Sequence, residues 1–408
     1  MSAPTIQVLV GFQTTANFGQ PFQLDDAAYG LLDTGTLGGY QLVDMTSQVL
    51  SISITRGRNR EMEQFNAGTA SVRFKDPNRI LDPLNTASPY YPYVGPRQPI
   101  QIYAGGNQIY SGFVTDWDLD YDYVTAGDVN TASCADAFTV LANQNMNKWT
   151  PTEQLSGARV DAVLNRPEVT YQGSYIIKTG SSTLGAFEIA AGTNVLTYLQ
   201  NVAASEGGYL FINSTGALVF LGRAYNLPVN SLTFSDTGSG VPYQALTNAF
   251  GDELLYNYIQ TQSPAGASPE VTSDPTSIAL YQAQQYSKLD LLNSTTTEVA
   301  ALGNYLLGRY KDPVLRFTGL QVQLAALTDA QQQLVLQADI SQISSVTKSF
   351  TVGTPSTVTQ NVFISGISHQ ITPGNHKVRF TFESVDQNGY FTLDDSIFGV
   401  LDQNLLAF

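Results

Sequence analysis

The chain has 408 residues, more than one hydrophobic core usually supports, so its length predicts two to four domains. Charged residues make up only 13% of it, and the polar surface must come mainly from Gln, Asn, Ser and Thr, which suits packing against neighbouring proteins. The net charge of -15 disfavours direct binding of nucleic acid or anionic membranes, and the single cysteine, Cys134, excludes an internal disulfide.

The first part of the chain has the alternating pattern of half-buried antiparallel strands. Apolar residues alternate with polar or small ones at 6–12, 52–54 and 72–74, and again from 100 to 123 around a turn at 105–106. Six prolines between 77 and 99 exclude a strand or helix interior, so we expect an ordered connection there, pinned by Tyr90, Tyr91 and Tyr93. We predict a first tube-type β-barrel domain over residues 1–148.

An acidic strand stands out within this region. In the run 116–122, DWDLDYD, the odd positions are apolar or aromatic, so a strand would place one carboxylate row on a single face: Asp116, Asp118, Asp120 and Asp122. Like charges repel, and burying unpaired carboxylates is costly, so the face must be wet, hold a metal or line a water-filled channel. A solvated outer face and a channel wall stay open as alternatives. A calcium site is less favoured, because calcium loops need turn glycines and converging ligands.

The middle of the chain changes to a helical period. Val195, Leu199 and Val202 recur at helical spacing, and glycines at 207 and 208 end this helix before a hairpin at 209–223. We predict a small α+β module over residues 149–235.

A second β-rich domain is predicted over residues 236–388, with a helical insertion. Asp274 and Pro275 begin one helix, and Thr295 with Glu298 predicts a capping box for a second, which ends before Pro313. Alternation then returns through residue 382, and this pattern indicates a second barrel. The stretch 263–275, rich in Pro, Ser and Gly, is the expected exposed loop or linker.

Two similarities within the chain indicate that it is built from related parts. The Ser-Gly pairs at 111–112 and 365–366, each flanked by apolar residues, indicate that the two β-rich regions correspond. The two ends also share a pattern at a constant offset: Phe22, Leu24, Asp25, Asp26, Gly30, Leu32, Asp33 and Leu37 recur as Phe391, Leu393, Asp394, Asp395, Gly399, Leu401, Asp402 and Leu406, with Tyr29 matched by Phe398. Apolar anchors beside Asp and Gly suit a strap that docks on a sheet edge or a neighbouring subunit. We predict an assembly role for both segments, the second being a docking segment over residues 389–408, unless they are unrelated loops of similar composition.

Signals for catalysis are weak. His369 and His376 flank a Pro-Gly turn and are expected to be surface or hairpin residues, although an imidazole pair could bind a metal. No HExxH, GxSxG, phosphate-loop or CxxC pattern occurs, and a carboxylate pair for glycoside hydrolysis is the one enzymatic option left open. We therefore predict a non-enzymatic protein with no cofactor and no metal. The start has no secretion signal, and no run of about eighteen apolar residues predicts a membrane span.

Several runs resemble the minor tail proteins of long-tailed phages infecting actinobacteria. They are SITRGR at 53–58, GTASVR at 68–73, DPLN at 82–85, SPYYP at 88–92, IYSGF at 109–113, EGG at 206–208, GALVF at 216–220 with Arg223, SIALY at 277–281 and GVLD at 399–402. The resemblance covers nearly the whole chain and rests on turn and core residues. Gln282 departs from it, because the family pattern has glycine there.

The resemblance implies a structural hub protein of the tail tip or baseplate, at the distal end of the tail in the virion. It implies two tube-type barrels per subunit and a homotrimer with pseudo-sixfold symmetry. The expected partners are the distal tail or tube protein, the tape measure protein and further minor tail proteins, with phage DNA passing through the channel without specific binding. On this interpretation Asp116, Asp118, Asp120 and Asp122 line the channel. A receptor-binding tail protein with exposed aromatic residues for cell-wall sugars is the alternative, and a wall-degrading enzyme is a third possibility.

Overall fold

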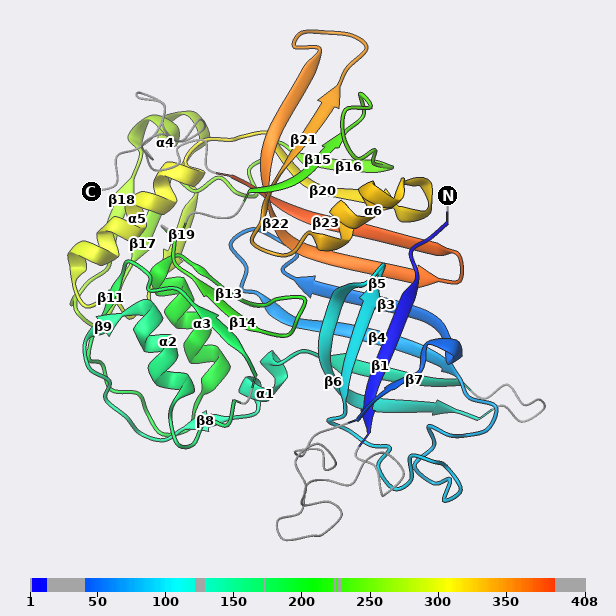
Figure 1. The fold of residues 1–408 in the computed structure, drawn as a ribbon. Coiled ribbons are helices and arrows are strands. Elements are labelled where there is room, and N and C mark those ends of the chain that lie inside the picture. Colours follow the sequence, from blue (N-terminus) through cyan, green and yellow to red (C-terminus); the bar gives the residue numbers. More distant parts are fainter. Residues whose placement is uncertain are drawn as a thin grey trace.

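A computed structural model describes residues 2–12, 41–121, 129–171, 173–223, 225 and 229–385. Strands dominate these ranges and helices are fewer, as the alternating sequence pattern predicted. In Figure 1 a large sheet occupies one side of the molecule, and modules that contain most of the helices occupy the other. No helix of the described part is long and apolar enough to cross a membrane.

Thirteen strands form the large sheet. Its main path runs β16-β20-β23-β22-β3-β4-β7-β6-β5-β1-β2, and β21 pairs with β22 and with β15. The strands are β1 (Ile6–Phe12), β2 (Gln41–Asp44), β3 (Val49–Gly57), β4 (Asn66–Lys75), β5 (Pro99–Ala104), β6 (Asn107–Asp120), β7 (Val129–Ala135), β15 (Val229–Ser235), β16 (Ala245–Ala249), β20 (Arg316–Gln323), β21 (Ile343–Ser349), β22 (Thr357–Thr372) and β23 (Asn375–Ser384).

Alternation gives the sheet one buried face and one exposed face. Ile54 and Val72 are completely buried, whereas Ser53, between the buried residues of β3, is exposed. In Figure 1 β1, β5 and β6 cross in front of β3, β4 and β7, so the first half of the sheet folds back on itself in two layers. The buried side chains of these layers belong to one core, which continues under β20, β22 and β23.

The two β-rich regions, predicted as two barrel domains, share this continuous sheet. Strand β3 pairs antiparallel with β22, from Ile52 opposite Ile371 to Gly57 opposite Gly366. We call this contact the β3–β22 joint. Its two strands lie more than 300 residues apart in the chain, so no local pattern in the sequence announces it.

The two halves of the sheet repeat one strand arrangement. In chain order, β3, β4, β5, β6 and β7 pair as β3-β4-β7-β6-β5, and β16, β20, β21, β22 and β23 pair as β16-β20-β23-β22-β21, with every ladder antiparallel. The expected relation between the two regions therefore holds for their topology. The Ser-Gly pairs are not equivalent, however, because Ser365 forms a bulge in β22 whose counterpart in β6 is Thr115.

The proline-rich connection at 76–98 is ordered mainly by aspartates. Asp76 accepts hydrogen bonds from the backbone of Ile80 and Leu81, both at 2.8 Å, and from the amide of Asn130 at 2.7 Å. Of the tyrosines predicted to pin it, Tyr90 is buried and stacks on Phe12 at a centroid distance of 4.3 Å. Tyr91 is 42% exposed instead.

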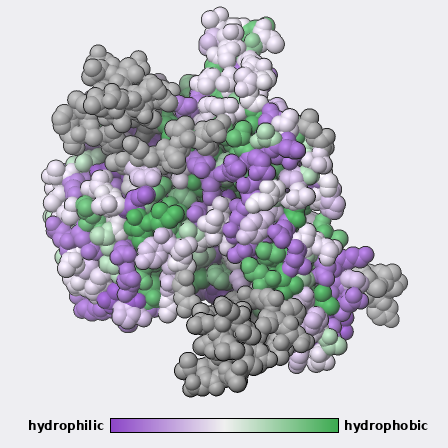
Figure 2. Space-filling model, in the orientation of Figure 1, coloured by the Kyte–Doolittle hydropathy of each residue, from purple (hydrophilic) through white to green (hydrophobic). Residues whose placement is uncertain are grey.

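A hairpin of β21 and β22 projects from the sheet at the top of Figure 1. Its surface has intermediate hydropathy in Figure 2, because threonine, serine and glutamine cover most of it. Two apolar residues stand at its tip, where Phe350 is 45% and Val352 83% exposed.

The middle module contains α1 (Phe138–Ala142), α2 (Ser156–Leu164) and α3 (Val195–Glu206). Gly207, with a φ of +68°, ends α3, and the hairpin of β13 (Tyr209–Ile212) and β14 (Leu218–Leu221) follows, as predicted. The remaining strands are short: β8 (Asn145–Met146), β9 (Gln154–Leu155), β10 (Tyr175–Ile177), β11 (Thr183–Leu184) and β12 (Thr193–Asn194).

A second module packs three strands against α5 (Thr296–Tyr310). The strands are β17 (Tyr258–Thr261), β18 (Glu270–Ser273) and β19 (Gln285–Lys288), so part of the predicted loop at 263–275 is a strand. Asp274 caps α4 (Pro275–Tyr281) as predicted. Thr295 caps α5, but the Glu298 carboxylate accepts from the backbone of Thr183 at 2.9 Å, so only half of the predicted capping box forms.

The sequence analysis missed α6 (Asp329–Gln337), which packs near β6 and β15. Its signal is present in the sequence, because Thr328 and Gln331 form a complete capping box. The described residues also include two single-turn 3₁₀ helices, η2 (Thr46–Gln48) and η3 (Leu324–Ala326).

Candidate functional site

The acidic residues predicted from the sequence lie on the second half of β6. Asp116, Asp118 and Asp120 are exposed on one face, and Asp122 lies outside the described residues. On the opposite face Trp117 is partly buried, and its indole N–H donates to the backbone oxygen of Gly95 at 2.9 Å. The expected alternation along this strand is therefore present.

The register of the sheet extends the acidic row into a much wider polar surface. Asp116 lies opposite Ser133, Ser133 opposite Ser71, and Ser71 opposite Ser53. The row continues to Gln370, Lys377 and Gln323. We call this surface the polar face, and its residues are Asp116, Asp118, Asp120, Thr131, Ser133, Ser71, Arg73, Lys75, Ser51, Ser53, Thr55, Ser368, Gln370, Lys377, Arg379, Thr381, Gln321, Gln323 and Thr247.

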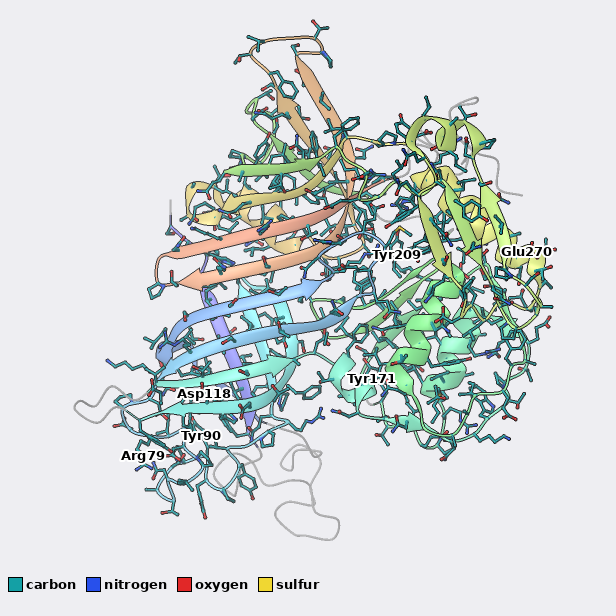
Figure 3. All side chains as sticks on the ribbon, turned by 180° about the vertical axis from the view of Figure 1, so that it is seen from behind. Arg79, Tyr90, Asp118, Tyr171, Tyr209 and Glu270 are labelled. Carbon is teal, nitrogen blue, oxygen red and sulfur yellow. The ribbon has the colours of Figure 1, made fainter. Side chains whose placement is uncertain are left out.

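Figure 3 looks toward this side of the molecule, with Asp118 near one end and β7, β4, β3 and β22 side by side above it. Apart from its charges the face consists mostly of hydroxyl and amide side chains, and the register adds two small apolar residues, Val129 between Asp120 and Lys75, and Ala245 opposite Gln321. Such a surface is wetted by water but offers no large apolar area for tight docking.

Charges of both signs lie in separate stripes on the polar face. The acidic stripe is confined to β6, while Arg73 and Lys75 lie on β4, and Lys377 and Arg379 lie on β23. Asp118 and Arg73 are two strands apart, roughly 10 Å, which is about the Debye length in 0.1 M salt. Within the described ranges no ion pair joins these stripes, so the charges stay available to the solution.

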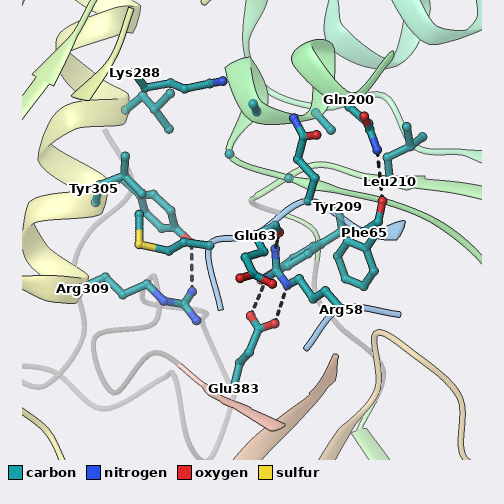
Figure 4. A pocket seen from close by; sticks show the side chains of 18 of the residues that line it. Arg58, Glu63, Phe65, Gln200, Tyr209, Leu210, Lys288, Tyr305, Arg309 and Glu383 are labelled. Atoms are coloured by element: carbon teal, nitrogen blue, oxygen red, sulfur yellow. Dashed lines mark hydrogen bonds and ion pairs between the residues drawn. The ribbon is translucent and has the colours of Figure 1, made fainter. Parts of the chain in front are cut away.

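A groove lies where the sheet, the middle module and α5 meet (Figure 4), with a volume of about 130 Å³. Phe65, Tyr209 and Tyr305 contribute aromatic walls. The guanidinium of Arg58 forms two hydrogen bonds with Glu383, at 2.6 and 2.5 Å, and stands 4.7 Å from the ring centroid of Phe65. Burial opposes the charge on Arg58, but the Glu383 carboxylate outweighs it and raises the Arg58 pKa.

A second ion pair closes the same groove. Arg309 donates to Glu61 at 2.9 Å, and the Tyr310 hydroxyl donates to the same oxygen at 2.8 Å. Burial raises the pKa of Glu61, although Arg309 opposes this shift. Because the arginines and the buried carboxylates bind one another, we interpret the groove as a structural contact between modules and not as a reaction centre.

The two histidines are buried hairpin residues, so of the two expected placements, surface or hairpin, the hairpin one holds. They lie on β22 and β23, beside the predicted turn, with exposed fractions of 2% for His369 and 0% for His376. The His369 Nδ1 and His376 Nε2 atoms are 3.0 Å apart and share a hydrogen bond. Burial lowers the pKa of His376 to about 4 and that of His369 well below 6.5. In the part of the chain that the structure describes, no group of three or more His, Cys, Asp or Glu side chains could hold a metal ion.

The remaining predicted residues belong to the terminal repeats. The segments that contain Phe22, Leu24, Gly30 and Leu32, and Phe391, Leu393, Phe398, Gly399 and Leu401, lie outside the described residues. Their assembly role stays a prediction.

Sequence reasoning missed the basic and hydroxyl members of the polar face. The sequence does contain a signal for them, which is the polar residues that alternate with the buried ones along each strand. In β3 these are Ser51, Ser53 and Thr55, on either side of the isoleucines. Joining those positions into one surface requires the strand order, which local patterns do not contain.

No known protein family matches this sequence, and no curated protein matches it. Solved structures do match. The 43 kDa tail protein of prophage MuSo2 from Shewanella oneidensis aligns over 93% of this chain and 98% of its own, with a TM-score of 0.58 and 13% identity. The tail protein from Neisseria meningitidis MC58 aligns over 93% and 96%, with a TM-score of 0.57 and 12% identity. At these identities the likeness shows that the chain shares their fold.

Proposed function

We propose that this chain is a structural hub protein at the tip of a phage-type tail, with no enzymatic role. Three copies form a ring that joins the tail tube to the tip, and the polar face lines the channel. The observation that carries this proposal is the fold, which two tail proteins share over 93% of the chain. The continuous polar face supports it, because a channel wall must be wet and free of apolar patches.

The polar face suits the passage of DNA without binding. Duplex DNA carries one negative charge per about 1.7 Å, and tight binding requires a protein to neutralise several phosphates at once. Here Arg73 and Lys75 are separated from Lys377 and Arg379 by the uncharged rows of β3 and β22, so few phosphates are contacted together. The carboxylates on β6 repel the backbone further along the wall.

The partners in this proposal are other tail proteins. A tube or distal tail protein continues the ring on one side, and the tape measure protein and further minor tail proteins contact it at the distal end of the virion's tail. Electron-microscopy class averages combined with native mass test the ring directly, and a threefold ring with a central hole is expected. A monomer that binds host envelopes saturably would indicate a receptor-binding protein instead, and release of sugars or peptides from envelopes would indicate an enzyme.

The channel role predicts a charge effect on genome delivery. Replacing Asp116, Asp118 and Asp120 by lysine adds phosphate contacts to the wall, so DNA ejection from virions should slow while assembly stays intact. Ejection is followed by the fluorescence of a DNA-binding dye after receptor or detergent triggering. The matched control replaces three exposed acids elsewhere, Glu153, Asp161 and Asp312, by lysine. Unchanged ejection in the first variant would show that these aspartates do not face the DNA.

A further inference from the structure

The two halves of the sheet are joined by one edge of each half. The equivalent second edge of each half stays unpaired among the described strands. Within the chain, β22 carries β23 on one flank and two strands on the other. Strand β21 pairs with residues 357–363 on that second flank, and β3 pairs with residues 366–371 beyond the bulge at Ser365. The first strand of one half thus pairs with the fourth strand of the other.

Strand β6 is the counterpart of β22, and its pairing partners are distributed along its two flanks in the same way. It carries β7 on one flank, and β5 pairs with residues 107–113 on the other. Its bulge lies at Thr115, so Val114 corresponds to Ile364, and Asp116 to Gly366. Backbone hydrogen bonds from residues 97–98 reach Val114, at 2.7 and 2.8 Å, and end there. In the described ranges, no strand pairs with this flank of residues 116–120, where β3 pairs in the other half.

Strand β16 is the counterpart of β3 and lies at the opposite edge of the sheet. It pairs with β20 alone among the described strands, and four of its five residues are exposed. The equivalence continues beyond it, because Gly251 stands where Gly57 ends β3. An exposed edge strand of this kind carries unpaired backbone groups that can bind another strand.

We propose that β16 of one copy of this chain pairs antiparallel with residues 116–120 of β6 in a second copy, as β3 pairs with β22 within the chain. This inference rests on the proposed function, because it supplies the contact that closes the ring. The partner is a second copy, since the complementary edges are the two ends of one duplicated unit and the internal joint already shows how they fit. The contact is heterologous, so it propagates in one direction until the ring closes.

The equivalence also fixes the register. Gln370 faces Ser53 at the internal joint, so Asp120 faces Thr247 at the new one, and Trp117 faces Phe250 because Ile367 faces Arg56. Phe250 is 69% exposed in the single chain, and this pairing would place it against a partly buried tryptophan. The carboxylates of β6 meet only uncharged residues across the joint, which avoids repulsion.

Disulfide trapping tests the register. Residues directly opposite in an antiparallel pair have Cα atoms about 4.5–5.5 Å apart, which a disulfide can span. Oxidised Asp120→Cys/Thr247→Cys protein should run as a covalent trimer on a non-reducing gel. The control Thr69→Cys/Thr247→Cys should not, because Thr69 is exposed on the same face but lies in β4, both of whose flanks are paired.

The outcomes separate the inference from the proposed function. Rings in class averages without cross-linking would overturn the pairing and leave the hub role standing. Cross-linked dimers or open chains without rings would support the pairing and overturn the closed trimer. Monomers that neither cross-link nor form rings, even with the tail-tube protein added, would overturn both.

A second variant needs no cysteine. Phe250→Ala should raise the concentration at which the trimer half dissociates about thirtyfold. Each of the three joints loses an aromatic anchor worth roughly 1.4 kcal/mol, a factor of about ten, and this concentration scales with the square root of the dissociation constant of the whole trimer. Leu280→Ala is the matched control, since Leu280 is 68% exposed on α4, away from both edges. Equal trimer stability in the two variants would contradict the proposed joint.

Discussion

Gln282 occupies a backbone conformation that usually requires glycine. It follows α4 with a φ of +62° and a ψ of 172°, and its backbone oxygen accepts from the Asn257 amide at 2.8 Å. In this region a side chain clashes with its own backbone, at a cost of about 1–3 kcal/mol. The glycine that the resemblance led us to expect here therefore has a physical reason, and the surrounding hydrogen bonds hold Gln282 in the strained state.

Gln282→Gly should consequently stabilise the protein. Release of the strain is partly offset by the greater freedom of glycine in the unfolded chain, so we expect a net gain of about 1 kcal/mol in the free energy of unfolding. Urea unfolding at neutral pH measures it. Gln285→Gly, in the neighbouring strand β19, should change stability in the opposite direction. A loss of stability in Gln282→Gly would mean that its side chain makes a contact worth more than the strain.

The buried histidine pair makes the fold sensitive to moderate acid. One neutral ring donates to the other, and His376 Nδ1 has no hydrogen-bond partner among the described residues. A proton added to the pair would place a charge in the core. Since the pKa of His376 is about 4 in the fold and near 6.5 in the unfolded chain, the unfolded state takes up the proton first as the pH falls.

Stability should therefore be full above pH 6.5 and decline between pH 6.5 and 4. For His376 alone the loss approaches about 3 kcal/mol, from a shift of roughly 2.5 pH units at 1.36 kcal/mol each. Urea unfolding midpoints across this range measure it, and His376→Gln should flatten the dependence because an amide keeps a hydrogen bond to His369 without titrating. An equally steep decline in His376→Gln would assign the effect to other groups.

At the scale of elements, β3 is where the parts of the molecule converge. Arg56 binds Asp339 at 2.7 Å, and Asp339 also accepts from the backbone of Ser214 at 2.9 Å, in the turn of the β13–β14 hairpin. Arg58, just after β3, binds Glu383 of β23 and stacks on Tyr209 of β13. Two arginines, one in β3 and one directly after it, thus hold both the second half of the sheet and the middle module.

Arg58→Lys tests this convergence. Lysine keeps the charge but cannot make both hydrogen bonds to Glu383 or stack on Phe65 and Tyr209, so unfolding free energy should fall by about 2 kcal/mol. The control is Arg79→Lys, which breaks a similar two-bond contact with Asp82, but from a side chain that is 48% exposed. That change should cost much less stability, because solvent screens an exposed pair. Equal losses of unfolding free energy in the two variants would show that burial of the Arg58–Glu383 pair does not add to stability.

For the whole molecule, local signals predicted elements and failed at long-range contacts. Asp274 and Gly207 marked helix ends correctly, because a cap acts within a few residues of itself. Burial of His369 was not predictable, since it depends on Ile54 of β3 lying beside it. The polar face could be anticipated on the second half of β6 alone, where the exposed positions 116, 118 and 120 are all aspartate, whereas its extension to Lys377 required the β3–β22 joint.

The β3–β22 joint also changes the kinetics of building the proposed ring. Six sheet units on separate chains would need five bimolecular encounters before the sixth joint closed the ring, each with an entropic cost of about 4–15 kcal/mol at 1 M standard state. Because each chain carries two units already joined, half of the joints form during folding and do not depend on concentration. The same linkage lets the two halves of the sheet diverge, so a feature such as the β21–β22 hairpin is displayed three times around the ring instead of six. A duplicated chain can thus present one symmetry to the tube above it and another to the tip below.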